Sequence, residues 1–151
     1  MEGRYQEIGD GLRIHYHDLG PTTGDPVVFL HGSGPGASGW SNFKKNAPYF
    51  AAHGKRAIVV DNLGFGRSSK ADVDHGIDYV VGGIRRFLDR IGIDKAAVIG
   101  NSHGGACAIK LALDEPSRVS KLVLMAPGGL EEREAYMQMS GIRTMMKIFM
   151  T

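Results

Sequence analysis

Four short apolar runs, separated by segments with helical periodicity, constrain most strongly what this chain folds into. The runs are residues 26–30, 56–60, 96–99 and 119–125, and each is apolar over most of its length. Strands that are apolar on both faces are typical of a parallel sheet covered by helices. Apolar residues recur at helical spacing between the runs, in segments 40–53, 78–91 and 102–115. This alternation predicts an α/β fold with a doubly wound, mostly parallel sheet and right-handed crossovers.

The residues ahead of the first run show a different pattern. Residues 12–17 alternate apolar and polar side chains, as a half-buried antiparallel strand does. Residues 4–8 are expected to pair with them through the turn Gly9-Asp10-Gly11. The sheet therefore begins with a hairpin.

Composition argues against several classes of partner. The 151 residues carry a net charge of +2, from 18 basic and 16 acidic side chains, which gives no bias toward nucleic acid or an anionic membrane. No apolar run is long enough for a membrane span, and the N-terminus lacks a signal-peptide pattern. The single cysteine, Cys107, allows no internal disulfide and favours a cytoplasmic location. We expect Cys107 to be a buried helix residue, with a catalytic thiol as the alternative. No motif calls for a metal or a cofactor.

Residues 100–105, Gly-Asn-Ser-His-Gly-Gly, join the third apolar run to a helical segment. A serine with glycines two residues before and after it, on a strand-to-helix turn, is typical of a nucleophile elbow. The N–H groups at the start of the helix favour negative charge developing beside the serine. We therefore predict that Ser102 is a catalytic nucleophile. The alternative is a serine that only caps the helix.

A glycine-rich loop, His31-Gly-Ser-Gly-Pro-Gly36, follows the first apolar run. Beside a nucleophile elbow, such a loop supplies one oxyanion-hole N–H and the residue after the nucleophile supplies the other. Here these donors are the backbone N–H groups of Ser33 and His103. Gly32 and Gly34 let the chain approach a reacting carbonyl closely and are predicted to border the substrate. His31 is interpreted as a structural residue of the loop rather than a base.

The same loop also matches a dinucleotide-binding pattern. Residues 34–39 read G-x-G-x-x-G, and Asp61 lies about 20 residues further on. The match does not follow the first strand of the chain, and it leaves the elbow at Ser102 unexplained. Asp61 is expected to brace the glycine-rich turn 61–68 rather than to act in catalysis.

Taken together, residues 31–43, 100–105 and 122–130 resemble the α/β-hydrolase superfamily, and within it the meta-cleavage-product hydrolases that break carbon–carbon bonds in ring-fission products. The resemblance implies a substrate of the 2-hydroxy-6-oxohexa-2,4-dienoate type, which is first converted from its dienol to its keto form. Ser102 then attacks the 6-oxo carbonyl, and cleavage gives a 2-hydroxypentadienoate and an acid. Asn42 and Asn101 match positions near the polar end of the substrate. Hydrogen bonds that brace the loops are the alternative role for both.

In this fold the triad acid and histidine follow the serine in the chain, and the only histidine after Ser102 is its neighbour His103. We therefore expect an N-terminal half of a hydrolase with little activity alone. Residues 1–129 are expected to form part of the core and residues 130–151 to begin a helical lid. The latter hold five of the seven methionines, a composition that suits an adaptable lid or an amphipathic helix packed on a core.

Two other functions remain open at this point. One is another serine hydrolase of the same fold, such as a carboxylesterase. The other is a non-catalytic fragment that binds a ligand. Each reading involves a small-molecule ligand. Because related hydrolases are often oligomeric, homo-oligomerisation of the complete protein is also an open alternative.

Overall fold

A single mixed sheet organises the computed structural model, which describes residues 2–150 except the side chains of Arg133, Met145, Phe149 and Met150. The order of its six strands is β1-β2-β4-β3-β5-β6. The hairpin β1/β2 is antiparallel, β2 also pairs antiparallel with β4, and the remaining pairs are parallel. The α/β class, the mostly parallel sheet and the N-terminal hairpin are thereby confirmed. The strands are β1 (Arg4–Gly9), β2 (Leu12–Leu19), β3 (Pro26–Leu30), β4 (Arg56–Val60), β5 (Ala96–Asn101) and β6 (Val119–Met125).

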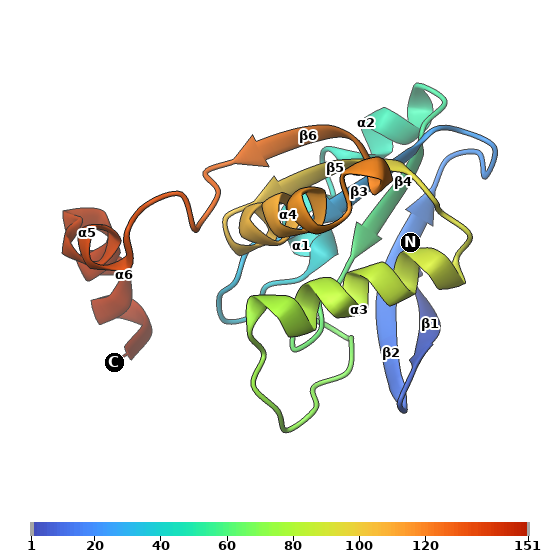
Figure 1. Ribbon diagram of the computed structural model, residues 1–151. Helices are drawn as coiled ribbons and strands as arrows, with labels where there is room; N and C mark the ends of the chain where they lie inside the picture. Colours follow the sequence, from blue (N-terminus) through green and yellow to red (C-terminus); the bar gives the residue numbers. More distant parts are fainter. Residues whose placement is uncertain (1, 151) are drawn as a thin grey trace.

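Helices cover both faces of the sheet, as the apolar strands require (Figure 1). The longer helices, α3 (Ile77–Arg90) and α4 (His103–Asp114), pack on one face, and α1 (Gly39–Phe43) and α2 (Ala47–Ala52) pack on the other. A 3₁₀ turn, Pro116–Arg118, leads into β6.

Alternate residues of the buried strands feed two apolar clusters. On the side of α3 and α4, Val28 packs with Val98, and Phe87 of α3 lies edge-on to Tyr16 with ring centroids 4.9 Å apart. On the other side, Phe29 packs against Phe43 of α1, with ring centroids 5.2 Å apart. The two-residue period of a strand therefore makes the sheet the centre of two cores.

Two helices expected as continuous are interrupted. Segment 40–53 divides into α1 and α2, because Pro48 lacks an N–H and lies in the first turn of a new helix. The methionine-rich segment divides into α5 (Arg133–Gln138) and α6 (Ser140–Met150), where Met139 adopts an extended backbone. Ser140 and Gly141 are weak helix formers at that point.

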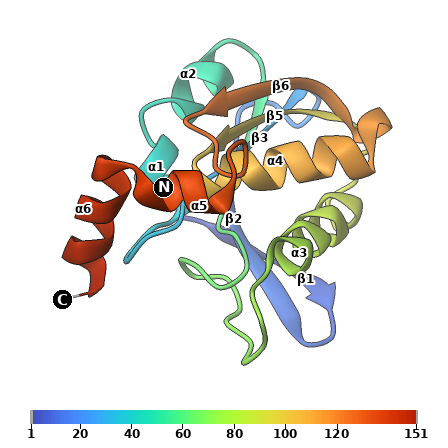
Figure 2. The same ribbon diagram turned by 60° about the vertical axis from the view of Figure 1, so that its left-hand side comes forward.

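Beyond β6 the chain leaves the sheet, and α5 and α6 lie to one side of it (Figures 1 and 2). Strand β6 forms the edge of the sheet, and its residues Leu122 to Met125 are each between 36% and 48% exposed. The edge of the sheet is therefore apolar and partly exposed. No helix in the described part of the chain is long and apolar enough to cross a bilayer.

An apolar edge strand presents unpaired backbone groups to other chains, so we predict that the 151-residue chain self-associates through β6. Val123, which is 48% exposed, is the position to change. Val123→Lys is expected to lower the hydrodynamic size measured by light scattering across a concentration series. Leu113→Lys on α4 is the matched control, because Leu113 is a more exposed apolar residue away from the edge. Equal effects of the two changes would contradict a specific role for β6.

Candidate active site

Ser102 occupies a strained turn between β5 and α4. Its backbone has φ 52° and ψ −116°, which a residue with a side chain adopts at a cost of about 1–3 kcal/mol. Two hydrogen bonds hold it there: Ser102 N donates to Met125 O at 2.9 Å, and Gly128 N donates to Ser102 O at 3.0 Å. The end of β6 and the loop that follows it therefore fix the predicted nucleophile.

The glycines around Ser102 are required by close packing of backbone on backbone. A Cβ atom at Gly104 would overlap the carbonyl oxygen of Leu30, and one at Gly105 would lie 2.7 Å from the Pro127 side chain. At Gly100 a Cβ would meet the carbonyl oxygen of Gly104. The glycine spacing thus lets α4 begin directly against β3 and β5, and the turn at Ser102 stays tight.

Ser33, Ser102 and His103 line one cavity of about 330 Å³, at the carboxyl ends of the parallel strands. This is the edge at which open α/β sheets bind ligands. His103 is the first residue of α4, where backbone N–H groups lack acceptors within the helix. The structure therefore brings together the predicted nucleophile and the two residues predicted to form the oxyanion hole.

Asn42 and Asn101 bind each other beside this cavity. The Asn42 side-chain oxygen accepts hydrogen bonds from Asn101 Nδ2 at 2.8 Å and from Gly32 N at 3.3 Å. Because a backbone N–H can only donate, the contact with Gly32 fixes the orientation of the Asn42 amide. Loop bracing is thus one function of this pair. No described residue accepts a hydrogen bond from Asn42 Nδ2, so that group remains free for a ligand.

Gly32 and Gly34, predicted together, are separated by the structure. A Cβ at Gly32 would come within 3.2 Å of Ser102 Cβ, so this glycine does border Ser102. Gly34 instead lines a different hollow, with Gly64, Phe65 and Lys70. The glycine-rich loop therefore faces two spaces.

His31 is a structural residue, as its sequence context indicated. It is fully buried, its Nδ1–H donates to Gly32 O at 2.7 Å, and its Nε2 accepts from Asn62 N at 3.0 Å. Burial lowers the pKa of His31, so the ring is neutral and its tautomer is fixed. It joins the two glycine-rich loops and leaves no nitrogen for proton transfer.

Asp61 braces the same loops from the other side. One of its oxygens accepts from Gly39 N at 2.7 Å, and the other accepts from Arg67 N at 3.0 Å and from His15 Nδ1 at 2.9 Å. Both oxygens are engaged within the protein. Asp61 therefore does not offer the free carboxylate that binds a ribose in a dinucleotide site.

The described residues provide no base for Ser102. No described residue makes a hydrogen bond with Ser102 Oγ, and His103 Nδ1 lies 3.8 Å from Cys107 Sγ instead. Cys107 is fully buried, which raises its pKa to about 12, so it remains a protonated thiol rather than a nucleophile. The described chain also holds no cluster of three or more potential metal-ligating side chains.

Glu131 and Tyr136 also line the Ser102 cavity, and neither was among the site residues predicted from the sequence. In the sequence they mark only the start and the apolar face of a helix. The chain reaches the cavity by turning sharply after β6, through Ala126 at φ 42° and Gly129 at φ 84°. No local sequence pattern predicts the turn that brings these two residues back to the cavity.

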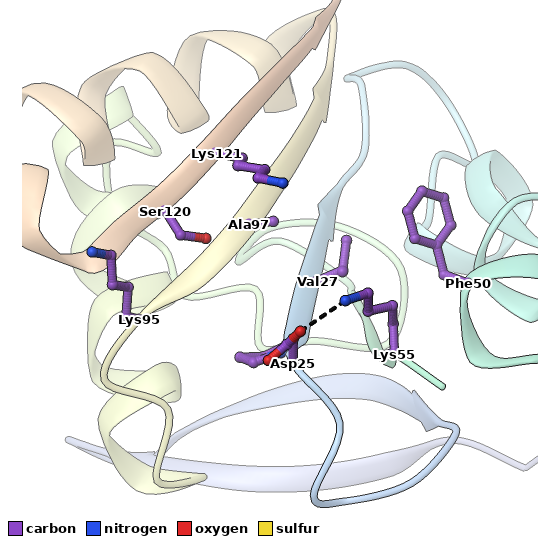
Figure 3. A pocket seen from close by; sticks show the side chains of 9 residues that line it. Asp25, Val27, Phe50, Lys55, Lys95, Ala97, Ser120 and Lys121 are labelled. Carbon is purple, nitrogen blue, oxygen red and sulfur yellow. Dashed lines mark hydrogen bonds and ion pairs between the residues drawn. The ribbon is translucent and has the colours of Figure 1, made fainter. Parts of the chain in front are cut away.

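A second hollow lies at the opposite ends of the strands. It measures about 460 Å³ and lies beside Lys55, Lys95 and Lys121, with Lys55 paired to Asp25 at 2.7 Å (Figure 3). Its strand residues come from the starts of β3, β5 and β6, far along each strand from the elbow. It is not part of the Ser102 site.

Residues 25–148 match the family model of the α/β hydrolase fold, and the chain belongs to that family. It is 42% identical over 140 residues to a 2-hydroxy-6-oxo-6-phenylhexa-2,4-dienoate hydrolase of Burkholderia cepacia, which covers 91% of this chain and 48% of that protein. It shows the same identity and coverage to a 2-hydroxy-6-oxononadienedioate/2-hydroxy-6-oxononatrienedioate hydrolase of Comamonas testosteroni. A solved meta-cleavage product hydrolase from Pseudomonas fluorescens IP01 superimposes with a TM-score of 0.80 and 34% identity, over 87% of this chain and 47% of the other. The chain thus spans about half the length of the relatives it matches.

The packing of Gly104 gives a direct test of the elbow. Gly104→Ala would place a methyl group against the backbone oxygens of Leu30 and His31, so we expect it to lower the free energy of unfolding by about 2 kcal/mol or more. Gly82→Ala on α3 is the matched control, because a Cβ there meets nothing within 4 Å and should stabilise the helix by about 0.5–1 kcal/mol. Urea denaturation measures both. A neutral Gly104→Ala variant would contradict the close approach.

The buried neutral ring of His31 predicts a pH dependence of stability. Its folded pKa is lowered, so the stabilisation is fully present above the unfolded pKa of about 6.5 and is lost as the pH falls toward the folded pKa. Each proton that the unfolded state binds and the folded state does not bind lowers the free energy of unfolding by about 1.4 kcal/mol per pH unit. Urea denaturation between about pH 7.5 and about pH 5.5 should show the free energy of unfolding decline. His31→Gln should reduce the slope of this free energy against pH by the amount that corresponds to about one proton. An unchanged slope in the variant would refute this assignment.

Proposed function

We propose that the whole protein is a serine hydrolase that cleaves a carbon–carbon bond in substrates of the 2-hydroxy-6-oxohexa-2,4-dienoate type. The observation that carries this proposal is the strained Ser102 elbow beside the hydrogen-bonded pair Asn42 and Asn101. Relatives that are about 40% identical to this chain, and of which it spans about half, are named for that class of substrate. Residues 1–129 would be part of the catalytic core and residues 130–151 the start of a lid over the substrate.

The proposed reaction begins when the 2-hydroxydienoate takes its keto form by moving the hydroxyl proton to C5. Ser102 Oγ then bonds to C6 while its proton passes to a base, and the backbone N–H groups of Ser33 and His103 stabilise the oxyanion. Breakage of the C5–C6 bond sends its electron pair into the conjugated 2-oxo group. Protonation releases 2-hydroxypenta-2,4-dienoate, and water hydrolyses the acyl group from Ser102. The conjugated substrate is its own electron sink, so this reaction calls on no cofactor.

The amide of Asn42 is suited to the polar end of such a substrate. Its oxygen is occupied by Gly32 N and Asn101 Nδ2, which leaves its N–H₂ group to donate to a carboxylate or a 2-oxo oxygen. Asn101 would then hold Asn42 in place, and the bracing hydrogen bond and the binding role belong to one arrangement.

The base is the part that this half of the fold does not supply. In the α/β-hydrolase fold the acid and histidine follow the serine in the chain, so we propose that they lie beyond the 151 residues. A serine without its base is a weak nucleophile at neutral pH. The 151 residues alone should therefore show little turnover. A cytoplasmic location, a small-molecule substrate and homo-oligomerisation of the whole protein remain predictions of the same proposal.

Ser102→Ala tests the nucleophile. In the intact protein, with a 6-phenyl dienoate as substrate, we expect it to lower kcat by about 10⁴-fold or more. The substrate's absorbance measures the rate, and chromatography identifies benzoate and 2-hydroxypenta-2,4-dienoate as products. Unchanged far-UV circular dichroism would show that the variant is folded.

Two further measurements separate the other functions. An organophosphonate should label the intact protein at Ser102, whereas a protein that only binds a ligand would not react. Turnover of a simple aryl ester with no turnover of the dienoate would overturn the proposal in favour of a carboxylesterase.

A further inference from the structure

The cavity beside Ser102 contains one side chain to which the proposed reaction gives no part, the imidazole of His103. Its backbone N–H has the role proposed in the oxyanion hole, and the residue lines the cavity together with Glu131 and Tyr136. The ring is half-buried and lies near Phe65, with centroids 6.1 Å apart. A polar side chain on a residue that lines the cavity can bind a substrate there.

Cys107 sets which nitrogen of the ring carries the proton. Its Sγ lies 3.8 Å from His103 Nδ1, one helical turn further along α4. Because the buried thiol keeps its proton, and an imidazole nitrogen is a better acceptor than sulfur, we assign the S–H as the donor and Nδ1 as the acceptor of this contact. The neutral ring then carries its own proton on Nε2. Burial lowers the pKa of His103, which favours this neutral form.

The Nε2–H group has no acceptor among the described residues. Nor is it one of the fully buried atoms that lack a partner, so it remains accessible to solvent or to a ligand. The cavity therefore has a neutral donor at His103 and a carboxylate acceptor at Glu131, both on the wall near Ser102. Asn42 and Asn101 are not part of this wall.

We infer that His103 is a specificity-determining residue that donates from Nε2 to a neutral oxygen on the substituent at C6 of the substrate. This inference rests on the proposed function, in which Asn42 receives the carboxylate end and C6 lies at Ser102. The substituent on C6 then enters the cavity lined by His103 and Glu131. A hydroxyl group there accepts a hydrogen bond from His103 and donates one to Glu131, whereas an anionic substituent is repelled by the carboxylate of Glu131.

The preferred substrate class is therefore a 6-aryl dienoate with a hydroxyl on the ring, over the unsubstituted 6-phenyl compound and over a dioate. In the intact protein, kcat/KM for a 6-(hydroxyphenyl) dienoate should exceed that for the 6-phenyl compound by about tenfold, the effect of one well-placed hydrogen bond. His103→Phe keeps a ring against Phe65 but removes the donor, and should abolish that preference. His53→Phe changes an exposed histidine on the other side of the sheet and should leave it intact.

A spectroscopic measurement on the intact protein tests the part played by Cys107. Proton–nitrogen correlation spectra of the His103 ring should show the Nε2–H tautomer, and Cys107→Ala should mix the two tautomers. In the intact protein the same variant should weaken the preference for the hydroxylated substrate, which a purely space-filling role for His103 would not produce.

The outcomes are distinct. Cleavage of neither dienoate overturns the proposed function and the selectivity that rests on it. Cleavage of both, with a ratio that His103→Phe leaves unchanged, overturns the role of His103 alone. An Nδ1–H tautomer in the spectra also overturns it.

Discussion

The contact between the start of α4 and the ends of β3 and β5 is the constraint on which the rest of the site depends. Gly104 lies where any Cβ would strike the backbone of Leu30, so the helix starts directly on the sheet. That closeness forces Ser102 into its positive-φ turn and aims the helix N-terminus at the same cavity. The strain, about 1–3 kcal/mol, is held by backbone hydrogen bonds to Met125 and Gly128. The predicted nucleophile is therefore positioned by packing.

A second layer of contacts places the glycine-rich loops around that turn. His31 and Asp61 each bind two separate segments through buried hydrogen bonds, and Asp61 also fixes Gly39 at the start of α1. Helix α1 carries Asn42, whose oxygen reaches Gly32 and Asn101. The polar side chains near Ser102 thus form one connected network across β2, β3, β4 and β5. The buried side chains of His31 and Asp61 are engaged within the protein. Asn42 Nδ2 and His103 Nε2, in contrast, have no partner among the described residues and can bind a ligand.

Much of this could be predicted from the sequence, because local patterns reported local structure. Strands β3, β4 and β6 have the predicted bounds, since apolar runs flanked by turn residues determine them. The elbow was recognisable because its glycine spacing is a local pattern, although Gly104 and Gly105 pack against Leu30 and Pro127, which are distant in sequence. The break at Met139 and the return of Glu131 and Tyr136 to the cavity were not predictable, since they depend on the turn through Ala126 and Gly129. The Asn42–Asn101 hydrogen bond was likewise hidden, because it joins residues 59 positions apart.

The proposed reaction requires Ser102 to form a covalent bond to C6 of the substrate. Rapid-quench mass spectrometry of the intact protein with a 6-phenyl dienoate can detect this bond. We expect a transient benzoyl group on the peptide that contains Ser102, absent from Ser102→Ala. Cleavage of the dienoate by the wild-type protein with the benzoyl group on another residue, or with no adduct at any time during turnover, would contradict it.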